Sequence, residues 1–457
     1  MPRQSLFILA LIVAASIHVQ AQISPVNTGQ AKAPVEKGPA DAESQRVLKE
    51  RRANAQSLLI NLAAEARNFA EASFRARTQA RIADALSYTD REQSRTIFRS
   101  AWEAAEIADA EIQARTQDLR QQQARNGGRL NVIQVGQGFR NEVLAIVMRR
   151  DPELGQEFLT RFKESSPATD ERSTATLQKA ATDALNANLD KSGVVTGKQP
   201  QNRNSVSIGS QPPPYQSSPV DLEPLLRDRA EHARTSAERD QIYVQLATML
   251  DEKDDERAHA YGEKIKDAEL RNAVRGFVDA SIAWKLVSTR DTEHALDFAR
   301  TGNLTHLQRS WLLSQTAGIL WVGDQQRAAQ VLEDATAEAR RIEVGDADRP
   351  RAFFAIANVL LTFNHAGVWS VMDDAIRAAN AADKFTGEDG QLSLRLITKS
   401  THIVHNRPFR GFEISGIFTK LALEDYDKTV ALARRLTQDA PRSIATIAIA
   451  RTVLAQR

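Results

Sequence analysis

Arginine recurs at one fixed place in the helical parts of this 457-residue sequence. It stands eight residues before an alanine at five positions, and at a sixth if Ala450 marks the last helix: Arg75, Arg239, Arg275, Arg309, Arg349 and Arg442. A guanidinium group donates paired hydrogen bonds to a carboxylate, so a row of arginines lining one face could grip an acidic peptide or glycan. The alternative is a packing role, in which each arginine reaches the last carbonyl groups of the preceding helix or a nearby acid. Packing is the commoner use of arginine at helix junctions.

We take four residues as candidates for binding a partner: Arg275, Arg309, Arg349 and Asn358. The three arginines belong to consecutive copies of the spacing. Asn358 directly follows the alanine of the last of these copies.

Two other groups of residues could bind a cation. His402 and His405 have the H-x-x-H spacing that places two imidazoles on one face of a helix, but zinc needs a third ligand, which the neighbouring sequence lacks. Glu388 and Asp389 lie between two glycines and could contact a cation, although glycine and aspartate are also ordinary turn residues. Because neither ligand set is complete, we predict no metal site.

Glu164 and Ser165 resemble the Glu-Ser pair of exported transglycosylases, which combine helical superhelices with a catalytic glutamate. The glycine-rich segment that should follow is absent, and Pro167 comes at once. No Ser-His-Asp motif, phosphate loop or dinucleotide fingerprint is present either. We therefore predict no catalytic residue and no cofactor, and we keep a periplasmic hydrolase or glycan-binding protein on an all-helical scaffold as the alternative function.

Helices must position the arginines, and the residues around each alanine predict pairs of them. After Ala317, an aspartate follows at +7 (Asp324), and small or apolar residues follow at +11, +15 and +18 (Ala328, Leu332 and Ala335). The alanine suits a close contact between helices, and the aspartate suits the start of a second helix, whose free amide its side chain accepts. The last three residues share one face of that second helix. Further copies begin at Ala83, Ala247 and Ala357, a copy with one inserted residue begins at Ala283, and a weaker copy begins at Ala145.

The alanines of the C-terminal part lie at 247, 283, 317 and 357, at intervals of 36, 34 and 40 residues. Periods in this range indicate stacked helical hairpins. The segment "RAAQVLEDA" resembles the second-helix pattern of tetratricopeptide-like repeats, whereas the first-helix signature of that family is poorly kept. The resemblance implies an all-α fold of antiparallel hairpins stacked as a tetratricopeptide-like α-solenoid. An irregular helical bundle is the alternative.

The repeated spacing of alanine, aspartate and apolar residues is absent between residues 385 and 420. A glycine-rich turn precedes Leu392, Leu394 and Leu396, and alternation of this kind favours a strand over a helix. We predict a short β-hairpin-like insert near 391–415. Insertions in repeat arrays often carry the binding surface.

The N-terminus has the pattern of a signal peptide. A basic start is followed by the apolar run Leu6–Ala15 and by small residues at Val19 and Ala21, which places cleavage near Ala21. The run is shorter than the ~20 residues that a membrane span needs. The sequence has no cysteine, so neither disulfides nor a lipid-modified cysteine can form.

Composition divides the rest of the chain. Two segments rich in proline and small polar residues indicate a disordered leader and a flexible linker. The predicted parts are a signal peptide (1–21), a disordered leader (22–42), an N-terminal helical repeat domain (43–165), a flexible linker (166–222) and a C-terminal helical repeat domain (223–457).

Charge narrows the class of partner. Lys+Arg total 60 and Asp+Glu total 58, with both signs interspersed, which argues against a nucleic-acid or anionic-membrane surface. Solenoids offer a long surface made by the first helices of each hairpin. We expect an exported protein, periplasmic or secreted, that binds other proteins or peptides as an interaction or scaffold module of the cell envelope. A purely structural protein that bridges partners across the linker is a third possibility.

Overall fold

The computed structural model describes residues 39–125, 138–165, 222–253, 256–363, 366–397 and 402–455. The predicted signal peptide, and nearly all of the predicted leader and linker, lie outside these ranges. Of the described residues, those from 48 onward belong to one compact unit, which holds every element from the second helix onward. Within the described ranges, no helix combines the length and apolar character needed to cross a bilayer.

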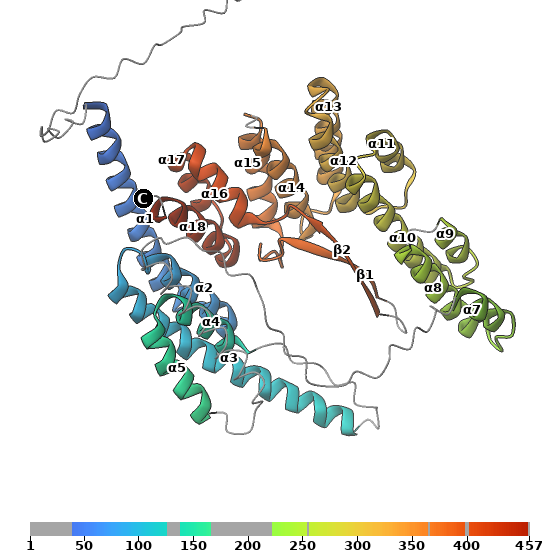
Figure 1. The fold of residues 1–457 in the computed structure, drawn as a ribbon, viewed down its shortest axis with the longest axis horizontal. Coiled ribbons are helices and arrows are strands. Elements are labelled where there is room, and N and C mark those ends of the chain that lie inside the picture. Colours follow the sequence, from blue (N-terminus) through green and yellow to red (C-terminus); the bar gives the residue numbers. More distant parts are fainter. Residues whose placement is uncertain are drawn as a thin grey trace, which may run out of the picture. The chain divides into compact units, whose positions relative to one another are not determined.

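Helices make up most of the described residues (Figure 1). The helices before the predicted linker are α1 (Pro39–Ala66), α2 (Ala72–Leu86), α3 (Arg91–Arg125), α4 (Phe139–Arg150) and α5 (Pro152–Ser165). Those after it are α7 (Leu222–Glu231), α8 (Ser236–Glu252), α9 (Arg257–Gly262), α10 (Ala268–Ser288), α11 (Thr292–Thr301), α12 (His306–Leu320), α13 (Gln325–Arg341), α14 (Asp348–Thr362), α15 (Val368–Ala381), α16 (Ile414–Glu424), α17 (Tyr426–Arg434) and α18 (Asp439–Leu454).

The alanines of the predicted spacing pack where helices approach closely. Five of them are fully buried: Ala83, Ala247, Ala283, Ala317 and Ala357. A larger side chain at any of these positions would separate the helices that meet there. The prediction of a buried alanine is wrong for the weaker copy. Ala145 is exposed, because α4 buries Val143, Leu144 and Val147 instead.

Aspartates begin the second helices as predicted. Four of them accept a hydrogen bond from the backbone amide three residues further on: Asp90, Asp151, Asp291 and Asp324. Each bond satisfies an amide that has no partner within its own helix. The corresponding Asp254 and Asn364 lie outside the described residues.

Helices pack in sequential pairs, and the pairs pack on one another. Close contacts join α12 with α13 and α14 with α15, and each even-numbered helix from α8 to α16 also contacts the next even-numbered one. Helix α18 in turn contacts α2, where the guanidinium of Arg451 pairs with the buried carboxylate of Asp84. The described residues are therefore mostly helical, with many packed helix pairs.

The predicted interruption is an antiparallel strand pair. Strand β1 (Gln391–Ile397) pairs with β2 (His402–Arg410), with Leu394 opposite His405 and a bulge between Leu392 and Leu394. Figure 1 shows the pair beside the helices that precede it in the chain.

These strands pack on helices α10 and α12, each of which comes first in its helix pair. Both strands contact α10, and Phe409 of β2 meets Trp311 of α12 edge to face, with ring centroids 4.5 Å apart. The indole Nε1 of Trp311 also donates a hydrogen bond of 2.8 Å to the carbonyl oxygen of Arg410. The strand pair thus lies against a face of the first helices, which is the surface that the sequence favoured for a partner.

Candidate protein-binding grooves

Most of the recurring arginines stabilise helix junctions. Four of the six donate to backbone carbonyl groups at the end of the preceding helix or in the loop after it: Arg75, Arg239, Arg309 and Arg349. Arg309, for example, donates to the carbonyl oxygens of Ala299 at 2.7 Å and Gly302 at 3.2 Å. The last carbonyl groups of a helix have no partner within it, so each arginine satisfies acceptors that the helix leaves open.

The remaining two arginines pair with acids. The Nε atom of Arg275 lies 2.9 Å from Oε1 of Glu263. Arg442 lies 2.9 Å from Asp439 and 3.1 Å from Glu65. Arg275 and Arg442 therefore also have the packing role, through nearby acids instead of carbonyl groups.

The structure does not gather the four candidate residues at one place. Arg309 lines a groove between α11 and α13, and Arg349 lines a second groove between α13 and α15. Arg275 lies outside both grooves and pairs with Glu263. Asn358 lies elsewhere on α14, where its Oδ1 atom accepts a hydrogen bond of 3.2 Å from Lys420 of α16.

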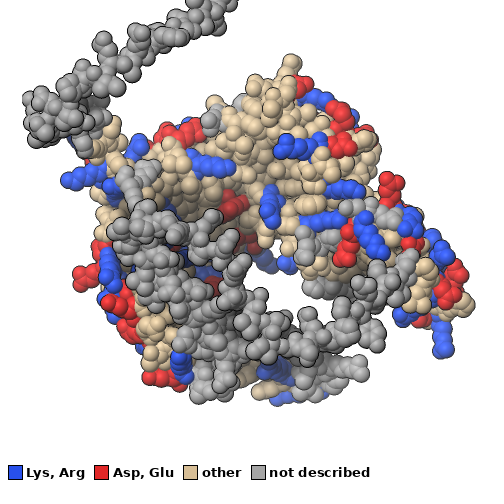
Figure 2. Space-filling model, viewed as in Figure 1, with Lys and Arg blue, Asp and Glu red and all other residues tan. Residues whose placement is uncertain are grey.

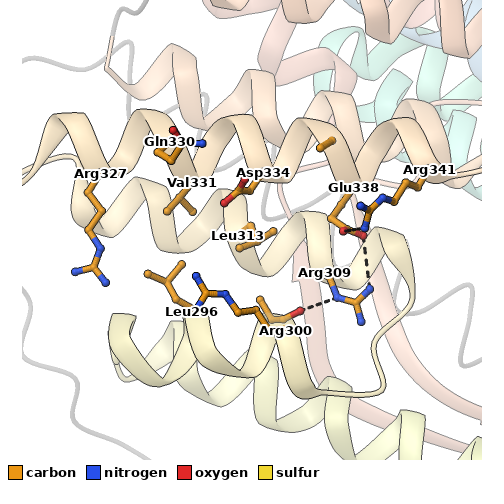
Figure 3. A pocket seen from close by; sticks show the side chains of 12 residues that line it. Leu296, Arg300, Arg309, Leu313, Arg327, Gln330, Val331, Asp334, Glu338 and Arg341 are labelled. Carbon is orange, nitrogen blue, oxygen red and sulfur yellow. Dashed lines mark hydrogen bonds and ion pairs between the residues drawn. The ribbon is translucent and has the colours of Figure 1, made fainter.

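A groove of about 580 Å³ opens between the second helices α11 and α13, with α12 beneath it (Figure 3). We call it the α11–α13 groove. Its lining residues are Leu296, Ala299, Arg300, Arg309, Leu313, Arg327, Gln330, Val331, Asp334, Ala337, Glu338 and Arg341. Residues 309 and 313 lie one helical turn apart, while Trp311 between them points the opposite way. The strand pair and the groove therefore use different faces of α12.

A buried carboxylate organises one end of this groove. Glu338 is 8% exposed, and its oxygen atoms lie 2.8 Å from Nδ1 of His306 and 3.6 Å from a guanidinium nitrogen of Arg309. Arg341 pairs with the same carboxylate (Figure 3). Because this one carboxylate contacts His306, Arg309 and Arg341 together, we assign Glu338 a role in positioning the two arginines.

The middle of the groove combines charge with apolar surface. Figure 3 shows Leu313 between the two second helices, with Leu296 and Val331 on either side. Arg327 extends from α13 and pairs with both carboxylate oxygens of Glu293 on α11, at 2.6 and 2.8 Å. This ion pair joins the two second helices across the middle of the groove.

A second groove, of about 320 Å³, lies on the other side of α13. This α13–α15 groove is lined by Arg340, Val344, Arg349, Phe353, Asp374, Arg377, Ala378 and Ala381. Arg340 and Arg377 both pair with Asp374. The neighbouring residues Arg340 and Arg341, at the end of α13, thus enter grooves on its two sides.

Sequence reasoning missed the residues that shape the first groove. Glu338 follows Val331 by seven residues and Ala335 by three, so it falls on the apolar stripe of its helix. A charged residue on such a stripe needs a partner, and this was the available signal. Arg300 and Arg341 follow no repeated spacing, so the sequence offered no means of singling them out.

The other residues with possible chemistry have ordinary surroundings. Glu388 pairs with Arg81 at 3.1 Å, and Asp389 pairs with Arg351 at 2.8 Å. His402 and His405 lie in β2, so they do not share a helical face. Glu164 is exposed near the end of α5. Among the described residues, no group of three or more His, Cys, Asp or Glu is placed to hold a metal ion.

The junction between α9 and α10 contains a histidine that should respond to pH. Nε2 of His259 lies 2.8 Å from a carboxylate oxygen of Asp279, which is itself buried. The hydrogen bond to Asp279 raises the pKa of His259 above its ordinary value of 6.5, against the opposing effect of burial; Glu263 also raises this pKa and Arg275 lowers it.

We expect the protein to be more resistant to urea at pH 6 than at pH 8.5 because of this pair. Since the folded-state pKa exceeds the unfolded one, the contribution is fully present below about pH 6.5. It is lost as the pH rises through the folded-state pKa. His259→Asn should reduce the difference between the two urea midpoints by more than His232→Asn does, because the pKa of His232 is also raised, by the backbone carbonyl of Asp228, but solvent screens that exposed site. An unchanged difference in His259→Asn would contradict the assignment.

No protein-family model, curated protein or solved structure matches this chain.

Proposed function

We propose that this protein is an exported helical-repeat protein that binds other proteins, as an interaction or scaffold module of the cell envelope. The observation that carries the proposal is the open α11–α13 groove, where exposed guanidinium groups surround a largely buried apolar floor between two second helices. Surfaces that combine arginine with apolar side chains are typical of protein interfaces. Export follows from the signal-peptide pattern before Ala21.

We further propose that the helix pairs stack as a tetratricopeptide-like α-solenoid. Three ion pairs between second helices support this arrangement: Arg257 with Glu223 at 2.8 Å, Arg327 with Glu293 at 2.6 Å, and Arg340 with Asp374 at 3.2 Å. The partners in each pair are 34 residues apart. One common separation is expected where each hairpin contacts the next in a regular stack.

Affinity capture tests the proposed function. The tagged protein is immobilised and incubated with an envelope extract, and retained proteins are identified by mass spectrometry. We expect at least one protein to survive washing and to be released by excess untagged protein. Retention of no protein, together with turnover of a glycan or peptide library, would refute the proposal in favour of an enzyme.

A further inference from the structure

Positive charge is concentrated in the two grooves beside α13. The α11–α13 groove is lined by four arginines against two acidic residues, and with Glu293, which pairs with Arg327 beside the lining, it keeps an excess of one positive charge. The α13–α15 groove is lined by three arginines against one acidic residue. The whole chain, by contrast, has a formal net charge of only +2. On the face shown in Figure 2, basic and acidic side chains are interspersed. An excess of one sign within a groove selects a ligand of the opposite sign.

The arginines of the α11–α13 groove differ in how many donors they leave available. Arg309 uses its guanidinium on two carbonyl groups and Glu338, so it serves the fold. Arg341 contacts Glu338 through a single nitrogen, and its side chain is 64% exposed. Arg300 is exposed, and no ion pair involves it within the described part of the chain. Arg300 and Arg341 can therefore donate to a ligand without breaking the contacts that hold the helices.

The apolar part of the groove identifies the kind of anion. Leu296 is half-buried, and Leu313 and Val331, which are 7% and 5% exposed, form the apolar floor of the groove among the arginines. An aliphatic side chain of a bound chain would cover the part of this floor that water still reaches. A protein segment supplies carboxylates and apolar side chains together. Nucleic-acid and sulfated-glycan backbones supply the charge without the apolar side chains.

We propose that the α11–α13 groove binds an acidic segment of a partner protein, with carboxylates at Arg300 and Arg341 and an aliphatic side chain over Leu313. This inference rests on the proposed function and specifies the chemistry of the partner. It also transfers the binding role from Arg309, the predicted candidate, to two arginines that the sequence did not single out.

Asp334 provides a test that does not depend on removing a stabilising contact. It is an exposed acid of α13 on the wall of the groove. Its carboxylate repels an acidic ligand, so Asp334→Asn should tighten binding several-fold.

The experiment measures fluorescence anisotropy of a labelled 12-residue peptide of glutamate and leucine, titrated with the full chain. Two control peptides replace every glutamate with lysine, or every leucine with serine. The double variant Arg300→Gln/Arg341→Gln should weaken binding by about tenfold or more, since each change removes a charge-assisted hydrogen bond. Arg395→Gln, at an exposed arginine of β1 outside both grooves, is the matched control and should bind as the unaltered protein does. Thermal melting of each variant verifies that it is folded.

Three results would overturn the proposal: equal binding by the double variant and the control, equal binding of the lysine peptide, or a dissociation constant unchanged by Asp334→Asn. Equal binding of the serine peptide would show that charge alone is recognised, and would overturn the assignment to an apolar-containing protein segment. Affinity capture separates this failure from failure of the proposed function. If Arg300→Gln/Arg341→Gln and the unaltered protein retained the same partners equally, the protein would still be a binding module. The result would refute the α11–α13 groove as its binding site.

Discussion

Replacing Trp311 with alanine should lower the free energy of unfolding by about 3–5 kcal/mol, the usual cost of removing a buried tryptophan from a core. Trp311 is 4% exposed and joins α12 to the strand pair. The substitution removes the edge-to-face contact with Phe409 and leaves the carbonyl group of Arg410 without its indole donor. Urea denaturation gives the free energy, and hydrogen exchange followed by mass spectrometry should show faster exchange in β2.

Trp311→Phe separates the two contributions of the indole. It keeps an aromatic ring near Phe409 but cannot donate to Arg410, so the expected loss is about 1–2 kcal/mol. If Trp311→Ala instead cost less than about 1 kcal/mol and left exchange in β2 unchanged, the strand pair would not be fixed to α12 as described.

Asp240→Ala should destabilise the protein by about 3 kcal/mol, because it removes two charge-assisted hydrogen bonds from a buried site. The carboxylate of Asp240, on α8, accepts from the backbone amides of Lys266 and Asp267 at 3.0 Å each. These amides lie just before α10, so one side chain fixes the start of the next first helix. Denaturant titration measures the loss.

Asp240→Asn is the matched control for this prediction. Its amide keeps one carbonyl oxygen as an acceptor and should lose about half as much stability as the alanine variant. Equal stability of Asp240→Ala and the unaltered protein would show that the two amides find other acceptors, and that successive helix pairs are not joined through Asp240.

The sequence predicted features that depend on neighbouring residues along the chain. The N-caps at Asp90, Asp291 and Asp324 follow from local hydrogen bonding, and buried alanines such as Ala317 follow from helical periodicity. The strand pair was predictable from the alternation of its leucines, since strands place successive side chains on opposite faces.

Contacts between distant segments could not be predicted in this way. Nothing in the local sequence indicates that α18 contacts α2, or that the strands cover a face of α10 and α12. Asp240 and Glu338 accept hydrogen bonds from groups 26 to 32 residues away, and that partnership depends on how the helices pack. The candidate arginines do lie on helices, as predicted. Whether such an arginine contacts backbone carbonyl groups or remains available to a ligand depends on where the preceding helix ends, and periodicity does not specify that position.

The most direct test of the central claim, that the α11–α13 groove receives a partner protein, is site-specific photo-crosslinking. A benzophenone side chain replaces Gln330, an exposed residue of α13 on the groove wall, or Leu423, a 62% exposed residue of α16 that lies outside the groove. After irradiation of the tagged protein with an envelope extract, we expect a discrete protein adduct from position 330 and none from position 423. Adducts of equal yield at both positions, or partners that co-purify without any adduct at position 330, would contradict the claim.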